Sequence, residues 1–251
     1  MITETFDNAT EEILKPSSLV KKIEGFPETV IVVFSTGMIE AFQKKNKSEV
    51  VCTVKSGIDV MVYKTAYKGK EIGYYLTWIG GPATVGILEE IIVMGAKKIL
   101  LFGACGSLEQ GITDGHIIVP THAYRDEGTS YHYASGRSGE FVEVKTAKRL
   151  SKILNELEIP VIEGKTWTTD AIFRETRRNM ELRKKAGCLT VEMECASVMA
   201  MAKFRNVEVY QFLFTADNLD CSEWESRILS NMPQDLNERY TQIALEVASR
   251  L

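Results

Sequence analysis

Short apolar runs alternate with longer segments of helical periodicity along most of this chain. Residues 98–102 and 207–215, for example, are rich in branched and aromatic side chains and stop close to a glycine or an acidic residue. Runs of this length between turn residues are typical of buried strands. Strands are predicted over residues 29–34, 50–54, 59–67, 71–78, 98–102, 115–120, 160–168 and 207–215. Helices are predicted over residues 79–94, 146–156, 174–185, 192–203 and 236–251, with a shorter one ending at Phe42. A tight turn is predicted over residues 103–106 and a long polar loop over residues 122–139.

Two features of this order define the fold class. Strands and helices alternate, and strands 59–67 and 71–78 are separated only by a short turn, which makes them antiparallel. We therefore predict a single-domain α/β fold in three layers (α/β/α) with a mixed, largely parallel central sheet. Because no linker, repeat or low-complexity tract divides the chain, one domain is expected over residues 1–251, with residues 1–25 as an N-terminal extension or arm.

Composition and charge exclude several classes of protein. The 251 residues are 45% hydrophobic, which is enough for a substantial core. The formal net charge of -4 argues against a nucleic-acid-binding protein, because such proteins usually carry a basic patch. No apolar run is long enough to cross a membrane, and the acidic N-terminal residues lack the apolar core of a signal peptide. The five cysteines form no CxxC pair and show no zinc spacing, so we expect free thiols in a reducing, cytoplasmic compartment.

Two carboxylates are the strongest candidates for chemistry. Glu194 lies in the segment Val-Glu-Met-Glu before an apolar helix, and Asp217 follows the strand predicted over residues 207–215. Carboxylates at the carboxyl edge of an α/β sheet lie where such folds bind ligands. One carboxylate can bind ribose hydroxyls while the other protonates a leaving base. A structural role is the alternative: Glu194 is favoured by the helix dipole in a first turn, and Asp217 is a common turn former.

Several segments in the same order resemble the nucleoside phosphorylase superfamily, which contains the purine nucleoside and uridine phosphorylases. They are residues 65–70, 100–108, 125–133, 168–173, 191–194 and 214–217. The resemblance implies an enzyme that cleaves the N-glycosidic bond of a nucleoside with inorganic phosphate, giving base and ribose 1-phosphate. It implies no metal or organic cofactor. It also implies a homo-oligomer, a dimer or a hexamer, in which a neighbouring subunit completes each site.

The resemblance assigns roles to individual residues. Glu194 would hydrogen-bond the ribose 2′- and 3′-hydroxyls, and Met193 would pack under the sugar. Asp217 would face N7 of a purine as general acid, which requires a raised pKa. Phe173 or Ile172 would pack on the base, with Phe173 the better candidate for stacking. The remaining substrate contacts would come from Glu192, Ala104, Cys105, Gly106 and His132.

The identity of the base is indicated less directly. The carboxylate at Asp217 is a feature of the purine-cleaving relatives, and residues 173–178 lack the Gln-x-Arg arrangement with which the uridine enzymes bind uracil. Residues 125–133 nevertheless resemble the uridine enzymes more closely. We therefore expect a purine to be favoured over uridine.

The phosphate site departs from the family pattern. Leu101 and Ala104 stand where phosphorylases have an arginine and a Ser or Thr, and no arginine lies in the first loop. Phosphate would then rely on Ser35, Thr36 and the helix start at Gly37, without charge-assisted hydrogen bonds worth about 1.5–3 kcal/mol each. Phosphorolysis is expected. One alternative is a purine nucleosidase, in which Glu40 would activate water; the structural alternative for Glu40 is a solvent-facing helix residue. The other is a non-catalytic nucleoside-binding or storage protein.

Overall fold

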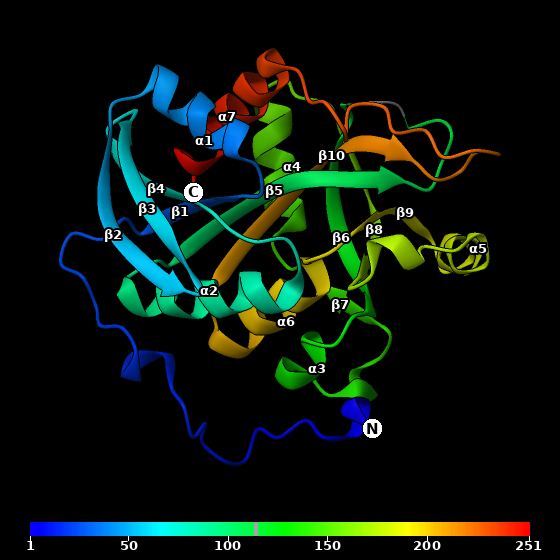
Figure 1. Cartoon of the computed structure of the whole chain (residues 1–251), viewed down its shortest axis with the longest axis horizontal. Helices are drawn as coiled ribbons and strands as arrows, with labels where there is room; N and C mark the ends of the chain where they lie inside the picture. Colours follow the sequence, from blue (N-terminus) through cyan, green and yellow to red (C-terminus); the bar gives the residue numbers. More distant parts are fainter. Residues whose placement is uncertain (113–114) are drawn as a thin grey trace.

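Ten strands join one sheet in the computed structural model, which describes residues 1–112 and 115–251 (Figure 1). The strands are β1 Thr29–Val33, β2 Ser48–Ser56, β3 Ile58–Tyr67, β4 Lys70–Leu76, β5 Lys98–Ser107, β6 Ile117–Asp126, β7 Phe141–Glu143, β8 Val161–Thr169, β9 Cys188–Glu192 and β10 Glu208–Asn218. The α-helices are α1 Thr36–Lys45, α2 Gly81–Met94, α3 Ser130–Tyr133, α4 Ala147–Glu156, α5 Arg177–Lys185, α6 Cys195–Arg205 and α7 Gln234–Ala248. The predicted α/β class is therefore confirmed.

The sheet is mixed, as predicted, but it is not largely parallel. Of its ten strand pairings, five are parallel and five are antiparallel. The antiparallel pairings are the two of the β2–β3–β4 meander, the pairing of β6 with β10, and those of the short strands β7 and β9, where the sequence predicts no strand. β5 pairs with β1 along its first half and with β9 at its end on one side, and with β10 along its whole length on the other. β9 also pairs with β8, β8 with β6, and β6 with β10. Because β10 pairs with β5 in turn, these five strands form a closed ring.

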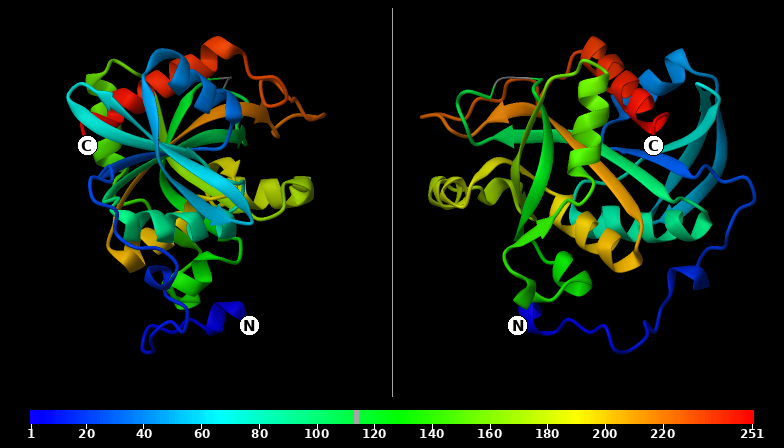
Figure 2. Two further views of the ribbon diagram at one scale, coloured as in Figure 1. Left: turned by 60° about the vertical axis from the view of Figure 1, so that its left-hand side comes forward. Right: turned by 180° about the vertical axis from the view of Figure 1, so that it is seen from behind.

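Helices flank the strands on two sides. In Figure 1, α1 and α7 lie above the central strands, and α2 and α6 lie below them. The rear view in Figure 2 shows the same separation. Residues 1–25 run along the outside and contain only two short 3-10 helices, Ile2–Glu4 and Pro16–Ser18. None of the helices that the structure describes is both long and apolar enough to cross a membrane.

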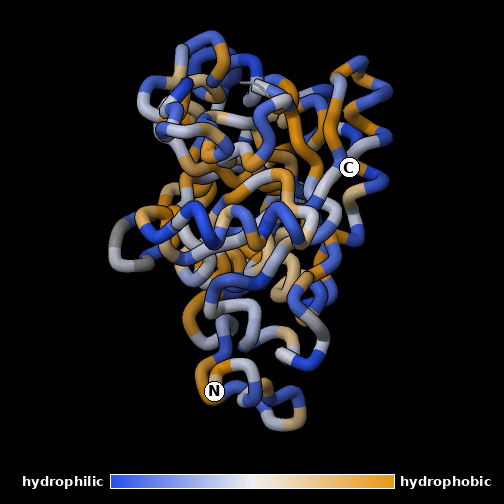
Figure 3. The backbone as a smooth tube through the Cα atoms, turned by 90° about the vertical axis from the view of Figure 1, so that its right-hand side faces the viewer, coloured by the Kyte–Doolittle hydropathy of each residue, from blue (hydrophilic) through white to orange (hydrophobic). Residues whose placement is uncertain are grey.

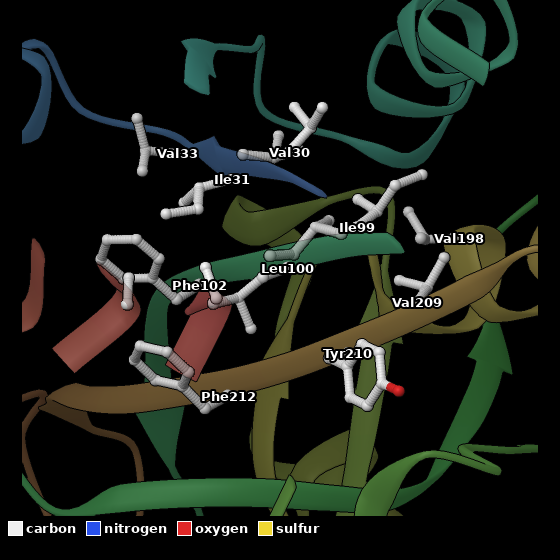
Figure 4. Packing of buried hydrophobic residues seen from close by; sticks show 14 of the residues in the cluster. Val30, Ile31, Val33, Ile99, Leu100, Phe102, Val198, Val209, Tyr210 and Phe212 are labelled. Carbon is white, nitrogen blue, oxygen red and sulfur yellow. The ribbon is translucent and has the colours of Figure 1, made fainter. Parts of the chain in front are cut away.

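The core lies between the strands and these helices. Val30, Ile99 and Phe102 are fully buried, and Phe102 stacks on Phe212 with ring centroids 5.0 Å apart (Figure 4). Each large apolar side chain buried in this way contributes about 1.5–3 kcal/mol. Figure 3 shows apolar residues concentrated along the inner segments and hydrophilic residues along the periphery. This packing holds β1, β5 and β10 against one another, so that the positions of their carboxyl ends are fixed.

Three predictions of secondary structure are wrong in this part of the sheet. Residues 103–106 form no turn, because β5 continues through them and pairs with β10 and β9. Their glycines reflect close approach instead: a Cβ on Gly103 would lie 2.9 Å from the Phe34 ring, and one on Gly106 would lie 2.6 Å from Leu219. Residues 122–126 belong to β6 and not to a polar loop. The helix predicted from residue 192 begins only at Cys195, because Glu192 closes β9.

Candidate active site

Nine of the predicted site residues line one cavity of about 410 Å³, which we call the inner cavity. The parallel strands β5 and β10 end beside it, and the segment that follows β9 passes alongside the end of β5 (Figure 1). The nine residues are Ala104, Cys105, Gly106, Ile172, Phe173, Glu192, Met193, Glu194 and Asp217. Four distant parts of the sequence thus meet at one place on the sheet.

Glu194 occupies the N-cap position of α6, but its side chain does not cap that helix. Its Oε1 instead accepts a hydrogen bond of 2.6 Å from the N–H of Gly80, at the start of α2. The chain can turn here because Gly80 has φ of 104°, which favours glycine. Gly81 brings α2 so close to α6 that a Cβ would overlap the hydroxyl of Ser197. Burial, followed by the charge of Glu192, raises the pKa of Glu194.

Glu192 holds the first turn of α6 in place. Its Oε2 accepts hydrogen bonds from the N–H groups of Glu194 at 2.8 Å and Cys195 at 2.7 Å. Its Oε1 accepts from the hydroxyl of Thr168 at 2.5 Å, and that hydroxyl accepts from the N–H of Ala196. Both carboxylate oxygens are therefore engaged within the protein. Glu192 lines the inner cavity, but these bonds make it a support for the backbone of Glu194.

Asp217 lies at the other end of the inner cavity. A shift in the β5–β10 register between Thr215 and Asp217 marks a bulge, which reorients the side chain that follows it. Asp217 is buried, and its Oδ2 accepts a hydrogen bond of 2.8 Å from Nε1 of Trp224. Its Oδ1 lies 3.1 Å from the place that a Cβ on Gly106 would occupy. Burial raises the pKa of Asp217, while the hydrogen bond from Trp224 opposes that rise.

Glu175 is a site residue that the sequence did not reveal. Its surroundings in the sequence, rich in arginine, predict a solvated surface. The structure places it in the wall of the inner cavity, where burial and then the nearby charge of Asp217 raise its pKa to about 8. Two acidic side chains thus share the end of the cavity at which Asp217 lies.

Gln211 is a second such residue. It lies on β10 in register with Leu101 of β5, so the two side chains share one face of the sheet. The residue is buried and lines the inner cavity, and its Oε1 has no hydrogen-bond partner in the described structure. A buried amide oxygen without a partner is unusual and calls for a ligand or water. A polar glutamine within an apolar strand is the one signal that the sequence offered.

An outer cavity of about 470 Å³ adjoins the inner one. Both are lined by Ile172, Phe173, Glu175, Asp217 and Leu229. The outer cavity is lined in addition by Arg177, Met180, Leu219, Cys221 and Trp224. Several of these apolar side chains remain exposed at the rim, among them Phe173 at 94% and Trp224 at 58%.

The residues predicted to bind phosphate or water lie elsewhere. Thr36 and Glu40 line a separate cavity with Asp59 and Trp78, and a Cβ on Gly37 would lie 2.9 Å from the Asn237 amide. Ser35, Thr36, Gly37 and Glu40 are all absent from the wall of the inner cavity. His132 also lies outside it, in the short helix α3.

Among the described residues, no Arg, Lys or His lines the inner cavity, although the charge of Arg227 acts on Asp217 and opposes the rise in its pKa. Arg125 is committed to its own loop: its guanidinium donates to the Ser130 hydroxyl and to the carbonyls of Ser135, Gly139 and Ala134. Arg177 reaches only the outer cavity and donates to the carbonyls of Cys221 and Ser222. Over the described part of the chain, no group of three or more His, Cys, Asp and Glu side chains is arranged to hold a metal ion.

Comparisons with known proteins agree with this geometry. The family model of the phosphorylase superfamily matches residues 10–249, so the chain belongs to that superfamily. A purine nucleoside phosphorylase of Plasmodium vivax is 27% identical over 88% of this chain and 91% of its own length. A purine nucleoside phosphorylase (DeoD-type) of Caldanaerobacter subterraneus subsp. tengcongensis is 28% identical over 72% of this chain and 78% of its own length. A guanosine phosphorylase of Halorubrum lacusprofundi is 30% identical, over 57% of this chain and 59% of that relative.

Proposed function

We propose that this protein cleaves the N-glycosidic bond of purine nucleosides. One observation carries the proposal: two buried carboxyl groups, Glu194 and Asp217, line a single cavity from different elements. Cleavage of this bond leaves positive charge on the sugar and negative charge on the base, so it needs acidic groups at both ends. The names of the three relatives support a purine as the base.

The proposed roles follow the positions of the two groups. Glu194 hydrogen-bonds the ribose hydroxyls, with Met193 against the sugar. At the other end, Asp217 donates a proton to N7 as the bond between C1′ and N9 breaks and its electron pair passes to the base. The raised pKa of Asp217 favours the protonated form that this step requires. Phe173 and Ile172 cover the base, and Ala104, Cys105 and Gly106 form the wall behind the nucleoside.

Phosphate is the proposed acceptor of the sugar, and its oxygen forms the new bond to C1′. The support for it is membership of the phosphorylase superfamily and the names of the relatives. The products are then the free base and ribose 1-phosphate. The proposed chemistry uses proton transfer and electrostatic stabilisation by side chains, and it needs no metal or organic cofactor.

Hydrolysis is a second candidate, and the cation-free inner cavity favours it. Phosphate sites usually rely on charge-assisted hydrogen bonds from Arg or Lys, and none of these side chains lines the described wall of this cavity. The unpartnered Oε1 of Gln211 can accept a hydrogen bond from such a water. Water would then replace phosphate as the acceptor, and free ribose would form.

One assay separates the two candidates. Purified protein is incubated with inosine, adenosine, guanosine or uridine, with and without phosphate, and base, ribose 1-phosphate and free ribose are measured. Phosphate-dependent ribose 1-phosphate from the purine nucleosides is the expected result, and phosphate-independent free ribose would establish hydrolysis. Faster release from uridine would contradict the purine assignment. The Glu194→Ala variant is the matched negative control, and binding without base release from any nucleoside would indicate a non-catalytic protein.

We also propose that the chain is a single domain of three layers, supported by its one sheet with helices above and below it. A homo-oligomer is proposed because large apolar side chains are exposed beside the cavities: Ile79, at 65%, lines the inner cavity, and Trp78, at 47%, lines the separate cavity together with Met61. Sedimentation of the protein and of Met61→Glu, which alters the same surface, tests this; a monomeric wild type would exclude it. The five free cysteines support the proposed cytoplasmic location.

A further inference from the structure

The outer cavity begins where the base would end. The two cavities share Asp217 and Glu175, the acidic groups of the base end, whereas Glu194 and Met193 line only the inner cavity. A group that extends from a bound nucleoside into the outer cavity must therefore leave from the base and pass these two carboxyl groups. It cannot leave from the sugar.

The side chains of the outer cavity are mainly apolar and are incompletely covered. Met180, Leu219 and Leu229 are part of its wall, and the rings of Phe173 and Trp224 stand at its rim with most of their surface exposed. Concentrated exposed apolar surface beside a polar site marks a place that a ligand or a partner covers. At about 470 Å³ the cavity is as large as the inner one, so it has room for a group of several carbon atoms.

Purine chemistry determines which group this is. N7 and the exocyclic atom on C6 lie on the same edge of the ring system, so a purine that presents N7 to Asp217 also directs its 6-substituent toward the outer cavity. An amine link fits this junction, because its N–H can donate to the carboxyl group of Glu175 or Asp217. We propose that the preferred substrates are purine nucleosides whose 6-amino group carries an apolar alkyl or arylalkyl substituent, which occupies the outer cavity. This inference rests on the proposed cleavage of purine nucleosides.

The test is a substrate series with adenosine, N6-methyladenosine and N6-benzyladenosine. We expect kcat/KM to rise along the series, with at least a tenfold gain from adenosine to the benzyl compound, because each buried carbon adds favourable transfer. Cys221 lines only the outer cavity, so Cys221→Phe fills that space and should bring the ratio of the two kcat/KM values to one or below. The matched Cys221→Ser variant should keep the ratio.

Other results would overturn the inference. Cleavage of adenosine at an equal or higher kcat/KM than the benzyl compound would remove it and leave the proposed function intact. An unchanged ratio together with an altered sedimentation coefficient in Cys221→Phe would show that a second copy of the chain covers these residues. Calorimetric binding of adenine and N6-benzyladenine to the wild-type protein needs no variant and no turnover: at least tenfold tighter binding of the benzyl base supports the subsite, and equal binding excludes it. Failure to release base from any nucleoside would count against the proposed function alone.

Discussion

The inner cavity has two ends, which we call the proposed sugar end, at Glu194, and the proposed base end, at Asp217. They are built in different ways. At the sugar end, Glu194 accepts from the N–H of Gly80, and Glu192 accepts from two N–H groups at the start of α6. Backbone groups of two packed helices thus fix this end. At the base end, Asp217 is held by the indole of Trp224, and Glu175 lies nearby on the segment between β8 and α5. Apart from Asp217, which lies near the end of β10, side chains from connecting segments form this end, and Phe173 and Trp224 among them are exposed.

The two constructions suit the two parts of a nucleoside: the ribose, which all nucleosides share, and the base, which varies among them. A ribose has the same hydroxyl groups in every nucleoside, so a rigid backbone frame can hold its carboxylate partner in one geometry. Bases differ in size and polarity, and loop side chains can change without disturbing the sheet. Substitutions at the sugar end should therefore affect every substrate, whereas those at the base end should discriminate among substrates.

The largest effect is expected for Glu194→Ala. Loss of the acceptor leaves two buried ribose hydroxyls without a partner, at about 1–3 kcal/mol each, and should lower kcat/KM about a thousandfold for inosine and uridine alike. Steady-state kinetics measures this, and thermal unfolding checks that the fold persists without the acceptor for Gly80. With 2′,3′-dideoxyinosine, which lacks both hydroxyls, the variant and the wild type should be nearly equal. Near-normal turnover of inosine would exclude the ribose role.

Asp217→Asn should have the next largest effect, and only on purines. Loss of a general acid costs about a hundredfold in rate, so kcat/KM for inosine should fall by that factor while uridine changes only a few-fold. The control substrate is 7-deazainosine, which has no N7 to protonate and should show little difference between variant and wild type. An equal loss on inosine and uridine would remove Asp217 from the leaving-group step.

That Glu192, Met193 and Glu194 lie together could be predicted from the sequence, because they are neighbours in the chain. The Val-Glu-Met-Glu segment brings Glu192, Met193 and Glu194 to one strand end and one helix start, and the prediction that this segment opens a buried helix was wrong only in where the helix begins. Strand boundaries were missed where pairing overrides local pattern. Gly103 and Gly106 are typical of a turn, yet β10 and β9 hold them in an extended strand.

The base end could not be predicted in the same way, because burial there depends on segments far apart in the sequence. Glu175 stands among charged residues typical of a solvated surface, and its pKa is raised by burial in the fold and then by the nearby charge of Asp217 on β10. Gln211 gains significance only from its place in the cavity wall, where its Oε1 is buried without a partner. The residues expected to bind phosphate or water stay a prediction: Thr36 and Glu40 follow β1 closely in sequence, and they line a cavity other than the one that contains Glu194 and Asp217.

Glu175→Gln should change stability in a pH-dependent way. The pKa of Glu175 is raised to about 8, above its ordinary value, so between those two values the folded protein binds a proton that the unfolded chain lacks. Stability contributed by this group is therefore lost as pH rises through that window. The glutamine side chain in Glu175→Gln cannot ionise, so the variant avoids this loss. The difference in free energy of unfolding, variant minus wild type, should be about 2 kcal/mol larger at pH 9 than at pH 5. Urea unfolding at both pH values measures it, with the exposed Glu181→Gln as control; a pH-independent difference would contradict burial of Glu175.

Trp224→Phe should give the smallest effect and test the base end most finely. The indole N–H stabilises the Asp217 carboxylate, so its loss should raise the pKa of Asp217 further. Because the protonated acid is the proposed active form, kcat/KM for inosine should begin to fall at a higher pH than in the wild type. The pH profile of kcat/KM measures this shift, and the same substitution in the Asp217→Asn background should produce none. A shift to lower pH, or one that persists in that background, would show that another group controls this limb of the profile.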